Sequence, residues 1–155
     1  MSIDLTHQPY VDRLRRFLGD NAALNVLTQE QESDDLLLHD CIEDAIDEIN
    51  SFGHSTSYDF DDVIDATLPW NMVKLGATLQ VLTSRGILSS RNMLSYNDTG
   101  GIQVRDTDTY GRYINYYNVL INKYMAQLRS FKYAKNIDDG YGEYQSELRQ
   151  DWWWD

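Results

Sequence analysis

The chain has a single cysteine, Cys41, so it cannot form an internal disulfide. Cys41 lies among apolar residues at helical spacing, which favours a small buried side chain over a nucleophile, in a reducing compartment. Long apolar runs are also lacking: no stretch has the length of a membrane span, and MSIDLTHQPYVDRLRR holds no apolar signal-peptide core. We therefore expect a soluble protein made in the cytoplasm, without a membrane partner.

Basic residues are missing from a long part of the chain. Residues 30–65 contain thirteen Asp and Glu and no Lys or Arg, a local charge of −13. Residues 85–135 instead hold eight basic residues against three acidic ones, a local charge of +5. The net charge of −12 disfavours nonspecific nucleic-acid binding by the whole surface. The asymmetry suits contact between copies or docking on an oppositely charged partner, and the alternative is two solvated helix faces of different sign.

A recognisable catalytic or cofactor motif is also lacking. His7, His39 and His54 are scattered, and none forms a two-histidine metal pair at helical spacing. We expect His39 at the edge of a helix surface and not as a ligand, since a metal site also needs partners that orient its ligands. The segment that begins at Asp106 starts like a calcium loop, but its twelfth position is Tyr117, which has no carboxylate. The sequence predicts no enzyme, no cofactor and no metal site.

Four segments carry apolar residues at the alternating spacings of three and four that are typical of amphipathic helices. They are expected to begin near Pro9, at Ser33 as N-cap, near Pro69, and at Thr107 or Asp108. Gly19 ends the first, the second runs to about Phe52, and the last runs to about Lys135. The fold class is therefore mainly α, a small bundle of about four helices.

The apolar stripes predict how these helices pack. The stripes are Tyr10, Leu14, Phe17 and Leu18 in the first helix, Leu38, Ile42, Ala45, Ile49 and Phe52 in the second, and Ile114, Tyr117, Ile121, Tyr124, Leu128 and Phe131 in the last. Tyr113, Tyr116 and Leu120 widen the last stripe, and we interpret its tyrosines as a core face with solvated hydroxyls. The third helix is apolar over a wide arc, so it should be central, and Gly76 predicts close approach of a neighbouring helix.

A β-hairpin is expected near residues 95–105. Tyr96 and the alternating Ile102 and Val104 flank NDTGG, in which Gly100 and Gly101 supply the positive φ of a tight connection. Two strands alone are marginal in water. The hairpin is therefore a candidate for strand pairing with another chain.

Periodicity is lost after Lys135. Residues 136–155 read as an extended, acidic and aromatic C-terminal arm, so that residues 1–135 form the bundle domain. The arm carries Tyr141, Tyr144, Trp152, Trp153 and Trp154. Three indoles at a chain end need a partner surface or must fold back on the bundle.

The series of an acidic helix ending AIDEINSFG, then LPWNMVKLGATLQVL, the YNDTGGIQV hairpin and a Tyr-rich helix ending RSFKYAK resembles the head–tail adaptor (connector) proteins of tailed bacteriophages. The resemblance covers about residues 33–135. It implies a ring beneath the portal, commonly of twelve copies, at the head–tail junction of the virion. It further implies a C-terminal extension that docks on the portal, contact with a tail or neck completion protein, and double-stranded DNA that passes through without sequence reading.

On this interpretation the arm's aromatic side chains insert between portal subunits, because large apolar anchors offset the entropy that an arm loses on ordering. The alternative is that the arm packs on its own bundle. The basic residues Arg85, Arg91, Arg105, Arg112 and Lys123 could face DNA or the acidic helix of the next copy, and we favour contact between subunits, because strong phosphate contacts would hinder sliding DNA. A cytoplasmic helical module that presents its acidic face to a basic protein is the rival function.

Overall fold

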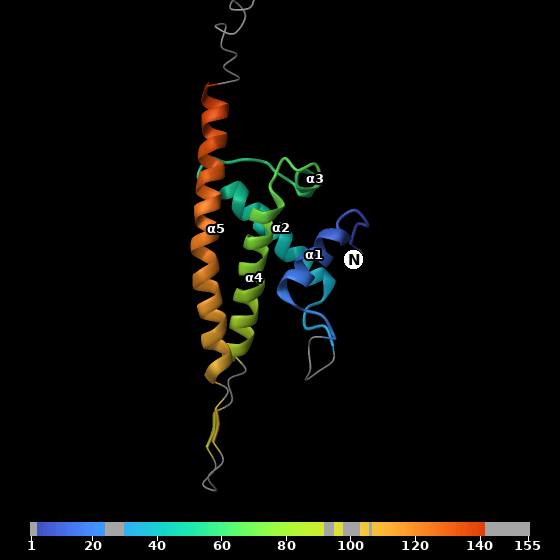
Figure 1. Cartoon of the computed structure of the whole chain (residues 1–155), viewed down its shortest axis with the longest axis vertical. Coiled ribbons are helices and arrows are strands. Elements are labelled where there is room, and N and C mark those ends of the chain that lie inside the picture. Colours follow the sequence, from blue (N-terminus) through green and yellow to red (C-terminus); the bar gives the residue numbers. More distant parts are fainter. Residues whose placement is uncertain (1–2, 24–29, 92–94, 98–102, 106, 142–155) are drawn as a thin grey trace, which may run out of the picture.

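The computed structural model describes residues 3–23, 30–91, 95–97, 103–105 and 107–141. These residues form five helices and two short strands, which are α1 (Gln8–Leu18), α2 (Asp35–Ser51), α3 (Phe60–Ile64), α4 (Trp70–Arg91), β1 (Ser95–Asn97), β2 (Gln103–Arg105) and α5 (Thr107–Tyr141). Figure 1 shows α5 standing alongside α4, with α1 and α3 on the side of the bundle away from α5. The expectation of a mainly helical bundle is confirmed.

Helix α4 is the central helix, as its wide apolar arc predicts. Both α2 and α5 pack against it. Its buried apolar side chains are Met72, Val73, Leu75, Ala77, Leu79 and Val81. From the facing helices, α2 contributes its predicted stripe, in which Leu38, Ile42, Ala45 and Ile49 are fully buried, and α5 contributes Tyr124 and Leu128. Hydrophobic burial around α4 is thus the main source of stability in the bundle.

Gly76 lies where the three main helices come closest. A Cβ at this position would stand 3.0 Å from the Cβ of Ala45 on α2 and 3.2 Å from the ring of Tyr124 on α5. Both contacts are tighter than nine in ten real Cβ contacts, so a side chain at residue 76 would require Ala45 and Tyr124 to shift by a few tenths of an ångström. The predicted close approach at Gly76 is confirmed, and it involves two helices instead of one.

A buried ionic network ties α1 and α2 to α4. The Asp20 side chain, 1% exposed, lies 3.3 Å from Arg15 of α1 and 3.3 Å from Arg85 of α4. It also accepts the backbone N–H groups of Glu32 and Ser33, over 2.7 and 2.9 Å. Burial by itself would raise the pKa of Asp20, but the hydrogen bonds from Glu32 and Ser33 and the nearby Arg85 guanidinium hold it below its ordinary value. The carboxylate therefore stays charged and connects segments that are distant in sequence.

This network corrects two sequence predictions. Ser33 is not the N-cap of α2: it is buried, and its hydroxyl accepts a hydrogen bond from Arg85 at 2.6 Å. The cap is Asp34, whose carboxylate accepts the N–H of Asp35. Arg85, a candidate for subunit or DNA contact, instead pairs with Asp20 and with Glu32. The positive charge of Arg85 is therefore paired with carboxylates of the same chain.

The link between α2 and α4 contains a short helix that the apolar spacing of the sequence does not predict. The reason is a capping box at α3: Asp59 accepts the N–H of Asp62, while the Asp62 carboxylate accepts the N–H of Asp59. Phe60 and Val63 then turn inward and are buried. A stretch read as polar thus contributes two side chains to the core.

Lys132 of α5 holds the segment that precedes α3. Its ammonium group donates to the His54 carbonyl at 2.9 Å and to the Thr56 hydroxyl at 2.7 Å. The side chain is buried, and this burial lowers the pKa of Lys132. A residue of the basic segment therefore serves a contact within the chain.

Two further helix predictions need correction. Phe17 does not share the buried face of α1, which consists of Val11, Leu14 and Arg15, and its ring is about half exposed. Helix α5 continues beyond Lys135 to Tyr141, so the first residues of the predicted arm are helical. The rest of that arm, residues 142–155, lies outside the described residues.

Strands β1 and β2 pair antiparallel at the predicted hairpin, with Tyr96 opposite Val104 and Ser95 opposite Arg105. Their connection, residues 98–102, is outside the described part of the chain. The two strands (yellow in Figure 1) extend from the end of the α4–α5 pair away from the other helices. Their pairing with another chain stays a prediction.

We expect Gly76→Ala to lower the free energy of unfolding by about 1–3 kcal/mol, because the added methyl group overpacks the contact with Ala45 and Tyr124. The matched control is Gly86→Ala in the same helix. There a Cβ would meet nothing within 4 Å, so alanine should stabilise by about 0.5–1 kcal/mol. Urea unfolding followed by circular dichroism measures both, and equal effects of the two substitutions would contradict the close packing at Gly76.

Asp20→Asn should destabilise the protein by about 3–5 kcal/mol near neutral pH, because Arg15 and Arg85 lose their buried partner. The depressed pKa also gives a pH dependence. Stability from Asp20 is complete above the ordinary pKa of 3.8 and is lost as the pH falls through the lower folded-state pKa. Unfolding midpoints measured at intervals of about one pH unit, from about pH 2 to about pH 7, should thus depend less on pH in Asp20→Asn. Asp12→Asn, on the exposed side of α1, is the control and should behave like the parent protein.

Candidate assembly surface and histidine cluster

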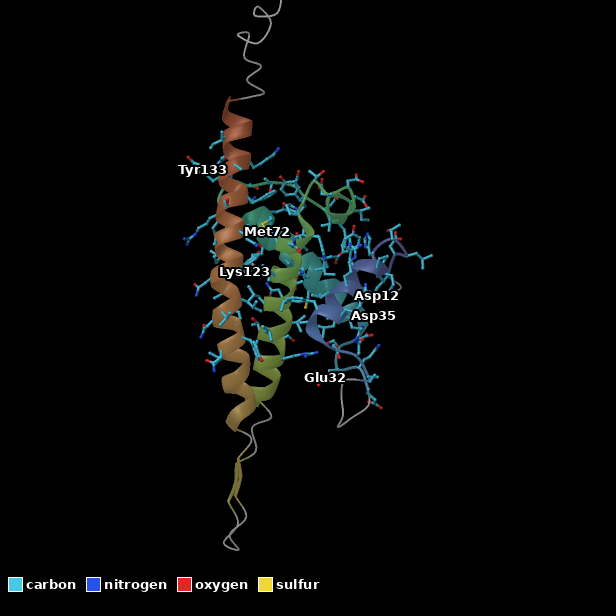
Figure 2. All side chains as sticks on the ribbon, in the orientation of Figure 1. Asp12, Glu32, Asp35, Met72, Lys123 and Tyr133 are labelled. Atoms are coloured by element: carbon cyan, nitrogen blue, oxygen red, sulfur yellow. The ribbon has the colours of Figure 1, made fainter. Side chains whose placement is uncertain are left out.

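Helix α5 has a second apolar stripe that faces away from the core. Its members recur at spacings of three and four and are all exposed, and two of the seven are polar. We call them the outer stripe: Tyr116, Val119, Lys123, Ala126, Ser130, Tyr133 and Ile137. The polar members, Lys123 and Ser130, also line grooves beside α4. Val119 and Tyr133 are each 71% exposed and Tyr116 is 64% exposed. Figure 2 shows Tyr133 on the side of α5 away from the bundle. A set of large apolar groups in water, aligned along one helix, is typical of an interaction surface.

This finding changes the interpretation of the α5 tyrosines. Tyr117 is partly buried, as a core face with solvated hydroxyls predicts. For Tyr124 the prediction is wrong, because the whole side chain is buried and its hydroxyl does not reach solvent. Tyr116, which was expected to widen that face, lies on the outer stripe instead, and Ile114 is also exposed. Helix α5 therefore has two apolar faces, one buried and one exposed. Their residues alternate along the sequence, so the sequence alone suggests a single broad face.

The surroundings of the outer stripe are basic. No Asp or Glu occurs from residue 109 to residue 137, whereas Lys123 and Arg129 are exposed on α5. A neutral-to-basic helix surface with apolar groups can accept a partner that offers apolar contacts and negative charge.

A surface with those properties exists on the same chain. The exposed side of α2 carries Asp40, Glu43, Asp44 and Asp47, and α3 and its N-cap add Asp59 and Asp61; we call this set the acidic face. Glu43, Asp47 and Asp59 line one shallow pocket between α2 and α3. Leu36, Leu37 and Ile64 expose apolar surface on the same two helices. In Figure 1, α3 and α5 lie on opposite sides of the bundle.

Two histidines that are far apart in sequence meet beside the acidic face. His7 Nδ1, just before α1, and His39 Nε2, on α2, are 2.9 Å apart, so one ring donates an N–H to the other. Phe60 of α3 stacks on both: its ring centroid is 3.8 Å from that of His7 and 5.5 Å from that of His39, with nearly parallel planes. Three segments thus hold the two rings in place.

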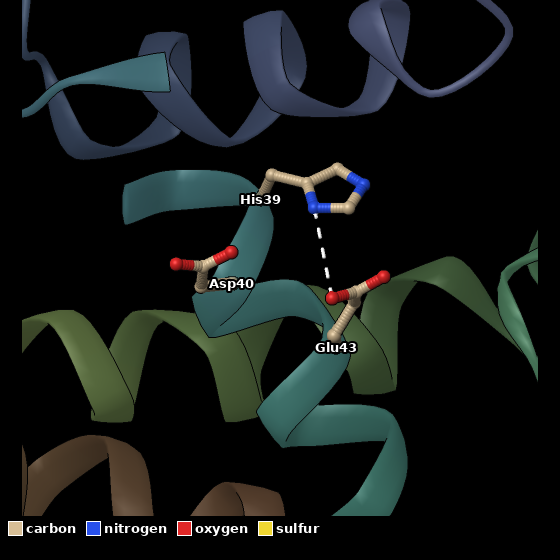
Figure 3. Close-up of side chains that lie close together, drawn as sticks. All are labelled: His39, Asp40 and Glu43. Atoms are coloured by element: carbon tan, nitrogen blue, oxygen red, sulfur yellow. Dashed lines mark ion pairs between the residues drawn. The ribbon is translucent and has the colours of Figure 1, made fainter. Parts of the chain in front are cut away.

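The other nitrogen of His39 faces carboxylates. His39 Nδ1 lies 3.8 Å from Glu43 Oε2, and Asp40 is adjacent (Figure 3). One donor atom each from His39, Asp40 and Glu43 can be chosen so that all three lie within 4.8 Å of one another. The His39 side chain is 11% exposed, while Glu43 is 56% exposed. The arrangement combines a fixed imidazole with two adjustable carboxylates.

His7, His39 and His54 are scattered along the sequence, which predicts no histidine pair. Folding nevertheless brings two of them together, and His54 lies apart with its carbonyl bound to Lys132. Spacing within one helix could not show the pair, because its members come from different segments. The only usable signal was the position of His39 one turn before Glu43.

The candidate residues for partner binding are only partly described. Tyr96 lies in β1, Val104 and Arg105 lie in β2, and Arg112 and Tyr141 lie in α5. The others fall outside the described residues: Gly100, Gly101, Ile102, Tyr144, Trp152, Trp153 and Trp154. Lys123, another candidate for contact between subunits, belongs to the outer stripe.

Burial removes one candidate for covalent chemistry. The Cys41 side chain is buried in α2, and desolvation raises the pKa of its thiol to about 11, with smaller contributions from Asp44 and Asp40. A thiol in this state is protonated and a poor nucleophile, as the sequence predicts for Cys41.

Searches against protein-family models, curated proteins and solved structures find no match to this chain. Among the described residues, none of the helices is both long enough and apolar enough to cross a bilayer. The inferences below therefore depend on the geometry of the chain itself.

Proposed function

We propose that this protein is a structural subunit of a homo-oligomeric ring, of the kind that tailed bacteriophages place between the portal and the tail. The observation that carries the proposal is the outer stripe, which exposes Tyr116, Val119 and Tyr133 along a helix whose opposite side already packs on the bundle. Exposed rows of large apolar side chains mark binding surfaces and not solvated faces. The resemblance of residues 33–135 to head–tail adaptors supports the same class of function.

In this ring, the outer stripe of one copy contacts the acidic face of the next. Lys123 and Arg129 of α5 meet carboxylates of α2 and α3, while Val119 and Tyr133 meet exposed apolar groups such as Ile64. The two surfaces differ and lie on opposite sides of the bundle (Figure 1), so the contact is head-to-tail. Repetition of such a contact closes a ring when the rotation per copy divides a full turn.

The remaining expectations complete the proposal. The ring holds about twelve copies, as the resemblance implies, and sits at the head–tail junction of the virion. The C-terminal arm binds the portal, the hairpin of β1 and β2 contacts a neighbouring chain, and a tail or neck completion protein binds below. Double-stranded DNA passes through without base-specific contacts. The role is one of assembly and not of catalysis.

To test the ring contact, we would combine Val119→Glu with Tyr133→Glu. A large side chain at the centre of an interface contributes about 2 kcal/mol, so association should weaken by about 30-fold or more per site. Asn118→Glu combined with Asn122→Glu is the matched control, because it adds the same two charges to exposed positions of α5 outside the outer stripe. Light scattering and negative-stain electron microscopy, with and without portal, report the assembly state.

Two results would count against this contact. Full assembly of the doubly substituted protein would exclude the outer stripe as an interface. A parent protein that stays monomeric at high concentration and beside portal would instead favour the rival, a helical binding module that offers its acidic face to a basic protein.

Deletion of residues 142–155 tests the arm. The deletion leaves α5 intact, so we expect an unchanged thermal midpoint and ring contact but at least about tenfold weaker binding to portal, since aromatic anchors dominate such interfaces. Replacement of Trp152, Trp153 and Trp154 by Ala should reproduce the loss. A lower midpoint with intact portal binding would show that the arm packs on its own bundle.

A further inference from the structure

We propose that His39, Asp40 and Glu43 form a binding site for a divalent transition-metal ion of the Zn²⁺ type. The proposal does not depend on the ring. It depends on the contact between His7 and His39, which neither the resemblance nor the assembly surfaces account for, and it shares Asp40 and Glu43 with the acidic face. The ligands would be Nδ1 of His39 and one carboxylate oxygen each from Asp40 and Glu43, with water completing the shell.

The distance between His39 Nδ1 and Glu43 Oε2 is too long for a hydrogen bond and leaves room for an ion between the two atoms. The 3.8 Å between His39 Nδ1 and Glu43 Oε2 exceeds the length of an N–H···O hydrogen bond, roughly 2.7–3.2 Å. Two ligands at about 2.0–2.2 Å from one Zn²⁺ lie roughly 3.3–3.6 Å apart at the tetrahedral angle. The observed 3.8 Å is slightly longer and corresponds to a ligand–metal–ligand angle of roughly 120–145°. The carboxylates of Asp40 and Glu43 are exposed, so small rotations can bring the third donor from within 4.8 Å to ligand distance.

The orientation of His39 supplies the feature that an acidic cluster alone lacks. When Nε2 of His39 carries the ring hydrogen, it donates to His7 Nδ1 across 2.9 Å, and Nδ1 is left with a free lone pair on the side of the ring nearer Glu43 (Figure 3). Metal-binding histidines typically donate their second N–H to such a partner, which fixes both tautomer and ring orientation. The absence of an orienting partner was the reason to discount His39 from the sequence, and folding provides one in His7.

Packing holds this orientation in the absence of an ion. The rings of His7 and His39 both stack on Phe60, whose side chain is buried. A ligand that is already fixed loses little conformational entropy on binding. The two carboxylates, by contrast, stay adjustable, which suits an ion with weak geometric demands such as Zn²⁺.

The local charge and the ligand types set the preferred ion. Residues 30–65 carry a charge of −13 with no Lys or Arg, so this side of the chain attracts cations in general. An imidazole nitrogen among the ligands then favours Zn²⁺, Ni²⁺ or Cu²⁺ over Mg²⁺ and Ca²⁺, which prefer oxygen ligands. A bound ion would also fix His39 against His7, and thereby the residues before α1 against α2.

Isothermal titration with ZnCl₂, on protein that carries no polyhistidine tag, tests the site. We expect one ion per chain, no comparable binding of Mg²⁺ or Ca²⁺, and a thermal midpoint that rises with Zn²⁺ concentration. His39→Gln should abolish binding. His7→Gln should weaken it by about 10–100-fold, the usual effect of losing an orienting partner.

Two controls separate ligation from folding and from nonspecific attraction. His54→Gln removes an exposed histidine outside the cluster and should bind Zn²⁺ like the parent protein. The double variant Asp40→Asn with Glu43→Gln changes only exposed side chains, so it should keep the parent circular dichroism spectrum while losing Zn²⁺ binding.

The proposal is overturned if the parent chain binds no Zn²⁺, or if His39→Gln binds it as tightly as the parent. Unchanged binding in the double carboxylate variant would also overturn it, because the ion would then lie between the two histidine rings. Equal affinity for Zn²⁺ and Ca²⁺ would show diffuse attraction by the acidic face and no built site.

Discussion

The arrangement of this protein depends on one close contact, the crossing of α2, α4 and α5 at Gly76. Because Gly76 has no side chain, Ala45 and Tyr124 approach α4 from two sides at the distance of direct van der Waals contact. This approach lets the buried stripe of α2 and the buried Tyr124 and Leu128 of α5 share one central helix. It also leaves the acidic side of α2 and the outer side of α5 exposed, and these are the two surfaces on which the proposed assembly rests.

The sequence predicts what depends on local periodicity and misses what depends on distant partners. The buried stripe of α2, the central place of α4 and the need for glycine at residue 76 all follow from spacing along the chain. The pairing of Arg85 with Asp20 and of His7 with His39 does not, because no local rule links residues that far apart. Helix α3 was missed for another reason: the two aspartates of its capping box are also typical of a solvated link. The outer stripe was hidden because α5 carries two interleaved apolar faces, and only burial separates them.

Charged side chains have different roles around Asp20 and on the exposed surface of α2 and α3. Around Asp20, the charged groups are buried, paired and hydrogen-bonded, and they hold α1, α2 and α4 in register. On α2 and α3, the carboxylates remain in water, which costs stability through mutual repulsion unless a cation lies nearby. A neighbouring α5 and a metal ion at His39 are two ways of supplying that positive charge, and they use different parts of the acidic face.

The contact made by Lys132 has a geometric consequence for any closed array of this chain. Its ammonium group reaches from α5 to two oxygen atoms of the segment that leads into α3. Rotation of α5 about its long axis would break both hydrogen bonds of Lys132. These bonds therefore restrict the rotation of α5 relative to the segment before α3. The Lys132 amine therefore adds to the packing of α5 on α4 in holding the angle between the two sides of each copy, and in a circular array that angle sets how many copies complete the circle.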